Sequence, residues 1–495
     1  MAEAESAPQK AAAEGAAAEV SVLSEVMAPL PASQRDKLQP AVRAIIEWLA
    51  PQKKAVIDPK VADAFIVDIE RRLEAQVNEI LHHAKFQAAE SAWRGLDLLV
   101  TRTDFMSEDR VIIEVLNVEK ETLRSDMNAH PGDMYHTDLY HAVYDAEYNQ
   151  AGGEPYGLMV GNFEFENTGQ DIQMLSDLGN IARASHCPIV SSISSKFFGF
   201  DSLEEFSNMR KDDLQRILDS PEYIAFKNFR QTEASRYIGL TLPRLLLRHP
   251  YGKNNVVPDF QSFTEKIDPE EEHEKFAWGN TAFAFASVVS QSFTKWGWMN
   301  NVAGKNAGGK VGELPIHSYK VGGADTYKVP TEAWITDTNE FNWSELGFIP
   351  LVSYKNQNFA VFFSSQALRQ PNLNLIDPLS RANERLGASL ANIMLTCRFA
   401  HYLKCILRDN LGRSMTPEKM QSELDTWARQ YWLNQETSDD ETMARRPLRK
   451  YKIEIKEKED EPGFYYINFE MTPHAKLVGV DLTMSLVADV PQPQG

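Results

Sequence analysis

The chain has 495 residues, of which 43% are hydrophobic, and its 51 Lys and Arg against 70 Asp and Glu give a net charge of −19. This excess of acid repels phosphate backbones and argues against a general nucleic-acid-binding protein. Three cysteines, Cys187, Cys397 and Cys405, are too few for a disulfide framework and indicate a reducing compartment such as the cytosol, and no apolar run reaches the roughly 20 residues that cross a bilayer.

The N-terminal region, residues 21–108, is predicted to be helical and to follow a disordered Ala- and Glu-rich tail at 1–20. Its first helix, at 21–30, is very short and amphipathic. The apolar stripe of this helix consists of Val22, Leu23, Val26, Met27 and Leu30. A second helix is predicted at 35–50, with a stripe made of Leu38, Val42, Ile45, Ile46 and Leu49. A third is predicted at 59–84, with a stripe made of Ala62, Ile66, Ile69, Leu73, Val77, Ile80 and Leu81.

The central region, residues 109–375, is predicted to be a mixed α/β domain. The apolar run VIIEVLNV at 111–118 is interpreted as a buried strand. The segments at 156–165, 170–185 and 188–193 follow one another as strand, helix and strand. This order and spacing predict a βαβ unit with parallel strands.

The rest of the central region continues the same alternation. A strand is predicted at 237–242 and an apolar helix at 276–293, and the acidic run at 268–275 is interpreted as a solvated segment before that helix. Apolar segments at 348–354 and 359–365 flank the turn KNQN, which predicts a β-hairpin.

The C-terminal region, residues 376–495, is predicted to contain two long helices, at 378–409 and 416–433, and then three strands that alternate apolar and polar residues. The apolar residues of the third strand are Val478, Val480, Leu482, Met484 and Leu486. This strand outruns the sheet available to it locally, so we expect it to pair with another chain or to form an edge. The predicted fold is therefore mixed α/β, with a helical N-terminal region, a central α/β domain, and C-terminal helices beside a three-stranded meander that pairs with partner chains.

A glycine-rich loop offers the first candidate chemistry. The sequence GKNAGGK at 304–310 matches part of the phosphate-binding motif G-x-x-x-x-G-K. Residue 311 is Val, whereas the motif needs Ser or Thr there for the metal ion, and a helix rather than a strand precedes the loop. We therefore reject nucleotide binding and interpret the glycines as turn formers.

A second candidate is the trio Cys397, His401 and Cys405, which lie four residues apart and would share one face of a helix. A metal site would need a fourth ligand, and thiols on an apolar helix face usually pack in the core. The carboxylates Glu164 and Glu166 are expected by chance in an acidic chain, so a glycosidase pair is the weaker interpretation. The sequence therefore predicts no catalytic residue, no cofactor and no bound metal.

The basic cluster RRPLRKYK at 445–452 is interpreted as a surface that meets an acidic protein or blunts a sheet edge. It also belongs to a set of six stretches, in order along about 400 residues, that share a family likeness. The stretches are AAESAWRGLDLLV (88–100), GNFEFENTGQDIQMLSDLGNIARASHCPIVSS (161–192), SRYIGLTLPRLLLRHPYG (235–252), FAWGNTAFAFA (276–286), GELPIHSY (312–319) and RRPLRKYKIEI with the strands that follow it. Together they resemble the large subunit of the type VI secretion contractile sheath, the TssC/VipB family, which is related to phage tail sheath proteins.

This resemblance implies a structural subunit of the bacterial cytoplasm that contracts to propel an inner tube for effector delivery. The implied partners are a small sheath subunit, the inner tube protein, baseplate components and further copies of the chain in a helical lattice. The resemblance also implies that the helix at 21–30 is bound by a hexameric AAA+ unfoldase that recycles contracted sheaths. Two alternatives stay open, an enzyme of unknown chemistry in the central α/β domain and a scaffold that does not contract.

Overall fold

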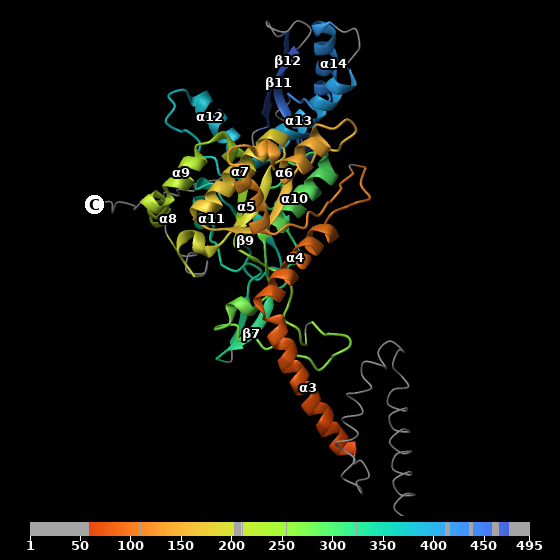
Figure 1. Ribbon diagram of the computed structural model, residues 1–495, viewed down its shortest axis with the longest axis vertical. Helices are drawn as coiled ribbons and strands as arrows, with labels where there is room; N and C mark the ends of the chain where they lie inside the picture. The colour runs from red at the N-terminus through yellow and green to blue at the C-terminus, as the bar shows by residue number, and fades with distance from the viewer. Residues whose placement is uncertain are drawn as a thin grey trace, which may run out of the picture. The chain divides into compact units, whose positions relative to one another are not determined.

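The computed structural model describes residues 59–108, 110–201, 209, 211–253, 255–322, 324–410, 416–434, 439–457 and 465–474 (Figure 1). The predicted tail at 1–20, the predicted helices at 21–30 and 35–50, and the predicted third C-terminal strand at 478–486 lie outside these residues. The chain divides into two compact units, Met1–Val77 and Asn78–Gly495.

Helix α3 (Pro59–Leu81) carries the described residues of the first unit. Its apolar residues recur every three or four positions, as predicted, and four residues of this stripe are exposed, one of them Ile80 near the end of the helix. Ile66, Ile69 and Leu73 have exposed fractions of 53%, 46% and 47%. Because of their spacing, these side chains form one apolar face of the helix.

The second unit is built around a six-stranded sheet with the strand order β1-β2-β3-β9-β10-β6. Four strands run parallel to one another: β1 (Met159–Phe165), β2 (Ile189–Ile193), β3 (Ile238–Leu242) and β9 (Ile349–Ser353). Two strands complete the sheet: β10 (Ala360–Phe362) runs antiparallel to β9, and β6 (Lys310–Val311) runs antiparallel to β10. The predicted βαβ unit and the predicted hairpin of β9 and β10 are confirmed.

Helices cover both faces of this sheet. Helix α7 (Gly169–Ser185) packs in the same buried cluster as Ile189, whereas α10 (Thr281–Trp296) packs in the cluster that contains the next residue of β2, Val190. Successive side chains of a strand point to opposite faces, so both faces of β2 are buried. This burial explains why the parallel strands appear in the sequence as continuous apolar runs.

Shorter elements surround the sheet. Further helices are α5 (Lys120–Ala129), α6 (Asp138–Tyr140) with a π-helix at His141–Tyr148, α8 (Lys211–Asp219), α9 (Ile224–Arg230) and α11 (Asp337–Glu345). Two small antiparallel sheets consist of β4 (Leu245–Leu246) with β5 (Trp278–Gly279), and β7 (His317–Val321) with β8 (Ala324–Lys328). The helix predicted at 276–293 begins only at Thr281, because Trp278 and Gly279 belong to β5. Asn280 is the N-cap of this helix, and its side chain accepts a hydrogen bond from the amide of Ala282.

Helix α4 (Ala84–Thr101) docks on α10 at a glycine. A Cβ atom added at Gly95 would collide with the ring of Phe283. Leu99, one turn further along α4, is buried with Phe283 and Ala286. The close approach of the two helices therefore requires the smallest residue at position 95.

The predicted strand at 111–118 is wrong, because residues 110–119 form neither helix nor strand. Ile113 packs against the cluster of Leu99 and Phe283, but Val115 and Leu116 are 68% and 63% exposed. An apolar run indicates burial without indicating a pairing partner, and a strand exists only where a neighbouring strand takes up its backbone hydrogen bonds.

The long helix predicted at 378–409 is divided into α12 (Pro378–Gly387) and α13 (Leu390–Asp409). The break has a backbone cause. The amide of Ala367 donates to the carbonyl of Ala388 at 2.8 Å, and the amide of Leu390 donates to the carbonyl of Ser365 at 2.8 Å. These bonds hold Ser389 in an extended conformation, as an isolated β-bridge to Gln366 that a continuous helix could not make.

Helix α13 passes through three buried clusters in turn. Leu390 and Met394 pack with α10 under the six-stranded sheet, Phe399 stacks on Trp298 with ring centroids 4.4 Å apart, and Leu403 packs against Ile453. The C-terminal elements around its second half are α14 (Pro417–Arg429), α15 (Asp440–Arg445), β11 (Leu448–Glu457) and β12 (Tyr465–Pro473). β11 and β12 pair as an antiparallel hairpin, which confirms the first two strands of the predicted meander.

Candidate assembly surfaces and buried charge clusters

The glycine-rich loop at 304–310 is organised by its own backbone. Gly304 and Gly308 have φ values of +86° and +109°, which confirms that they act as turn residues. The amide of Gly304 donates to the carbonyl of Phe362 at 2.7 Å, and Lys310 begins strand β6 with its ammonium 4.5 Å from the centre of the Phe359 ring. The loop therefore joins α10 to the sheet edge and does not have the strand-loop-helix geometry that cradles phosphate.

The trio Cys397, His401 and Cys405 lies on α13. Cys397 and His401 are buried, and Cys405 is half-buried. His401 Nε2 lies 3.2 Å from the backbone oxygen of Ser185, and its ring centroid is 5.5 Å from that of Tyr148. Burial raises the pKa of the Cys397 thiol well above its ordinary value and lowers the pKa of His401 to about 4. The predicted core role of Cys397 and His401 is confirmed by these contacts.

This burial predicts a pH dependence of stability. His401 is neutral in the folded chain until the pH approaches 4, but it takes up a proton near pH 6.5 once unfolded. Its contribution is therefore complete above pH 6.5 and is lost as the pH falls toward 4, by about 3 kcal/mol in the free energy of unfolding. We expect urea titrations of His401→Gln to show a smaller loss between neutral and acid pH than wild type, whereas His136→Gln, at an exposed position, keeps the wild-type loss. Equal pH dependence in all three proteins would contradict the prediction.

A buried ion cluster ties α4 to the segment that follows β4. The Arg248 guanidinium donates to Glu90 through Nε at 2.6 Å and to Glu265 through Nη1 at 2.6 Å. Glu265 also accepts from the amide of Tyr251 at 2.8 Å, and His82 Nε2 lies 3.2 Å from its second oxygen. Burial raises the pKa of Glu90, but hydrogen bonds from Arg248 and Arg94 outweigh burial and hold this pKa below its ordinary value.

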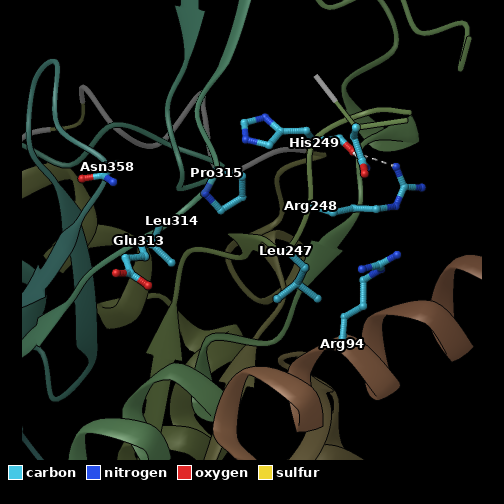
Figure 2. A pocket seen from close by; sticks show the side chains of 9 residues that line it. Arg94, Leu247, Arg248, His249, Glu313, Leu314, Pro315 and Asn358 are labelled. Carbon is cyan, nitrogen blue, oxygen red and sulfur yellow. Dashed lines mark hydrogen bonds between the residues drawn. The ribbon is translucent and has the colours of Figure 1, made fainter. Parts of the chain in front are cut away.

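An open cleft of about 470 Å³ adjoins this cluster (Figure 2). Arg94 and Arg248 face it from one side, and Glu313 and Asn358 lie on the other. Both arginines already donate to partners, since Arg94 is bonded to Glu90 at 2.7 Å and to the Tyr251 hydroxyl at 3.0 Å. Their charge is thus used within the protein, and the cleft does not have the electrostatics of an anion site.

A second, partly buried cluster contains three side chains with ligand-like spacing, His273, Glu274 and Glu332, whose ligand atoms lie within 4.8 Å of one another. Arg244 Nη2 lies between the two carboxylates, at 2.7 Å from an oxygen of each. Burial opposes ionisation of Glu332, but the nearby His273 ring, with its Nε2 at 3.8 Å, and the hydrogen bonds from Arg244 outweigh burial and lower the pKa of Glu332 to about 2. The guanidinium therefore provides the positive charge that a metal ion would bring, and we assign these residues as an ion pair.

The acidic run at 268–275, which we interpreted above as a solvated segment, is only partly exposed to solvent. Its His273 is largely buried and stacks on Trp278 with ring centroids 4.9 Å apart, while Glu274 pairs with Arg244. The end of the run is thus fixed to the folded domain by the contacts of His273 and Glu274. A histidine ring can pack on an aromatic residue while its charged neighbours stay in water.

The surface carries exposed apolar groups as well as an open sheet edge. Among the described strands, β1 has β2 as its single neighbour, so its other edge is unpaired. Val115 and Leu116 in the irregular segment before α5 are exposed, and so is Trp93 on α4, with an exposed fraction of 73%. Open edges and large exposed apolar groups are typical of surfaces that another protein covers.

The basic cluster at 445–452 falls at the end of α15 and in β11. Ile453 is buried against α14, whereas Lys452 points the other way and pairs with Glu454. Lys450 and Lys452 thus share the polar face of the hairpin. The contact of the basic cluster with an acidic protein stays a prediction. Glu164 is an exposed residue of β1, and the half-buried Glu166 donates its amide to Asp171 at the start of α7.

Comparison with known proteins decides the family. Residues 63–369 match the family described as EvpB/VC_A0108, tail sheath N-terminal domain, and residues 379–490 match EvpB/VC_A0108, tail sheath gpW/gp25-like domain. The type VI secretion system sheath protein TssC1 of Pseudomonas aeruginosa is 37% identical over 478 residues, which cover 95% of this chain and 94% of the relative. The chain belongs to the type VI secretion sheath family. It is a structural sheath subunit, as the resemblance implied.

A solved structure, the baseplate of the anti-feeding prophage determined by cryo-electron microscopy, aligns with this sheath subunit at 9% identity and a TM-score of 0.38, over 77% of this chain and 84% of that chain. None of the described helices is both long and apolar enough to cross a membrane.

The two sets of predicted site residues, the stripe from Val22 to Leu30 and the strand from Val478 to Leu486, lie outside the described residues of this sheath subunit. Sequence reasoning missed the buried charges instead. Arg244 and Arg248 flank three leucines in PRLLLRH. Arginine is rarely buried unless it is paired, so two arginines beside an apolar run are a signal that could have indicated buried ion pairs. Their partners carry no comparable signal, and two of them, Glu90 and Glu332, lie 158 and 88 positions from the arginine that they bind.

Proposed function

We propose that this chain is the large subunit of a contractile sheath, which assembles with a small sheath subunit as helical rings around an inner tube on a baseplate in the bacterial cytoplasm. Contraction of the lattice propels the tube and its effectors, and this chain itself carries out no catalysis. Identity of 37% to a named sheath protein along nearly the whole chain supports this function. The two family matches, which together reach from residue 63 to residue 490, support it as well.

The surface of the second unit supports an obligate partner. The open edge of β1 and the exposed residues Val115, Leu116 and Trp93 would stay in water in a chain that worked alone. Each large apolar side chain gains about 1.5–3 kcal/mol on full burial, so covering these residues favours association. A small sheath subunit is the partner that the family implies for such a surface.

The test is negative-stain electron microscopy of this chain co-expressed with the small sheath subunit from the same gene cluster. We expect hollow tubes, and tubes of two lengths or diameters when an inner tube is present or absent. Tubes that never shorten would favour a scaffold that does not contract. A chain that stays monomeric and soluble with or without its partner would overturn the proposal.

Recycling forms a second part of the proposal, in which an AAA+ unfoldase binds the stripe Val22, Leu23, Val26, Met27 and Leu30 once contraction exposes it. An isolated helix of ten residues is unstable, so this segment needs a groove in which to fold. Leu23→Asp with Met27→Asp is expected to leave assembly and one contraction intact while contracted sheaths accumulate. The matched control is Ser24→Asp with Ala28→Asp, which has the same spacing on the opposite side of the helix.

Binding of the 15–35 peptide to the N-terminal domain of the unfoldase gives the direct measurement. Wild-type and control peptides should bind, and the peptide with both stripe substitutions should lose most of its affinity. If the stripe and control variants bind alike, the stripe is not the recognition element.

A further inference from the structure

Side-chain contacts place the irregular segment before α5 alongside β1. Near the start of β1, Ile113 packs in one cluster with Leu158 and Val160. Near its end, Lys120 Nζ donates to the carbonyl of Glu164 at 2.7 Å. The two contacts advance in the same direction along both stretches of chain, so the segment runs parallel to β1. Among the described residues, no backbone hydrogen bond joins the two.

The side chains of the segment are divided between the two faces of the sheet, as those of a strand would be. Ile113 packs with Phe283 of α10, whereas Val118 packs against the cluster that contains α7. Their odd separation along the chain puts them on opposite faces of an extended segment. β1 has the same division, because Val160 packs on the α10 face and Phe165 on the α7 face.

The path of the chain also suits a strand at 111–118. This segment leads into α5 and then, through α6 and the π-helix, into β1. α5 packs in the same cluster as α7, which connects β1 to β2. A strand on the side of β1 away from β2 would therefore be connected to β1 across the same face and in the same direction as β1 is connected to β2. Its connection would have the same hand, as parallel connections of this kind require.

We infer that residues 111–118 are a strap that closes the open edge of β1 as a seventh, parallel strand when the small sheath subunit covers Val115 and Leu116. In the chain alone these two side chains are 68% and 63% exposed. Ordering the segment would then cost conformational entropy without burying them. A partner that buries them supplies the missing free energy, so strand formation is coupled to assembly. This inference rests on the proposed function, from which it takes the partner.

Hydrogen exchange of the full-length chain, alone and in tubes with the small sheath subunit, tests the strap. Amides of residues 112–118 should exchange rapidly in the chain alone and about tenfold or more slowly in the tubes. Tubes in which these amides still exchange rapidly would overturn the strap, and protection of β1 alone would then show that a strand of another chain fills its edge. Protection of 112–118 already in the chain alone would overturn the coupling to the partner. A failure to form tubes would count against the proposed function, and against the strap with it.

The directions of the backbone amides give a matched pair of variants. The amide of Met159 donates to the carbonyl of Pro188, just before β2, and the side chain of Met159 packs on the α7 face. In a parallel strand on the other side of β1, residues with side chains on the α7 face would therefore point their amides toward β1. Leu116 would be such a residue, because it lies two positions from Val118, whereas the amide of Val115 would point away from β1.

Leu116→Pro should lower the yield of tubes in electron micrographs by about tenfold or more, because proline has no amide to donate to β1. Val115→Pro is the control, since it also removes an exposed apolar side chain, and proline is tolerated in an edge strand where the amide faces away from the sheet. Circular dichroism of both variants should match the wild type, because both positions lie outside helices and strands in the chain alone. Equal yields from the two variants would overturn the strap.

Discussion

Deleting residues 475–495 is expected to abolish tube formation by this sheath subunit and its partner while leaving the α/β body folded. Within the described residues, β12 pairs with β11 alone, so the hairpin has an edge at which a further strand can add. The deleted segment contains the alternating residues Val478, Val480, Leu482, Met484 and Leu486. Pairing through the backbone would link neighbouring chains while the bodies move past one another.

Two single substitutions sharpen this test. Leu482→Asp places a charge on the apolar side of the predicted strand, whereas Thr483→Asp places it on the polar side. Electron microscopy should show tubes lost or strongly reduced for Leu482→Asp and retained for Thr483→Asp. Normal tubes from the truncated chain would mean that this segment is internal to one chain and plays no part in connecting chains.

Replacing Arg248 by Met is expected to lower the free energy of unfolding by about 3–5 kcal/mol, because it leaves Glu265 buried without its arginine and leaves Glu90 with Arg94 as its one remaining arginine partner. The side chains of Arg248 and Glu265 are 6% and 0% exposed, so water cannot take the place of the guanidinium. Urea unfolding of the full-length chain followed by tryptophan fluorescence measures the change.

Arg94 provides the matched control. It pairs with the same Glu90, but its side chain is 36% exposed, so Arg94→Met should cost about 1 kcal/mol or less. Adding Glu265→Gln to Arg248→Met should recover part of the loss, because it removes the buried carboxylate charge that the first substitution leaves without its arginine. Equal small effects of the Arg248 and Arg94 substitutions would contradict a structural role of the cluster.

The fold was predictable where side-chain periodicity and backbone pairing agree. The βαβ unit of β1, α7 and β2 follows from the order and spacing of its three segments. The hairpin of β11 and β12 follows from the alternation of apolar and polar residues along each strand. The segment at 111–118 was not predictable, because its apolar residues indicate burial but do not indicate what buries them. Likewise, the division of α12 from α13 depends on hydrogen bonds to Ser365 and Ala367, which no local pattern contains.

The candidate site divides in the same way. The core role of Cys397 and His401 follows from the apolar residues around them on one helix face. The ion clusters of Arg244 and Arg248 join residues up to 158 positions apart, and a charged residue in a sequence is indistinguishable from one on a solvated face until its partner is located.

The path of α13 has a mechanical consequence. This helix of 20 residues is about 30 Å long, with its first turns wedged under the six-stranded sheet and its later turns clamped beneath β11 and β12. A force applied to the hairpin therefore reaches the sheet along a stiff rod packed at both ends. We therefore expect a displacement of the hairpin to move the α/β body with it, because the helix that joins them is packed at both ends.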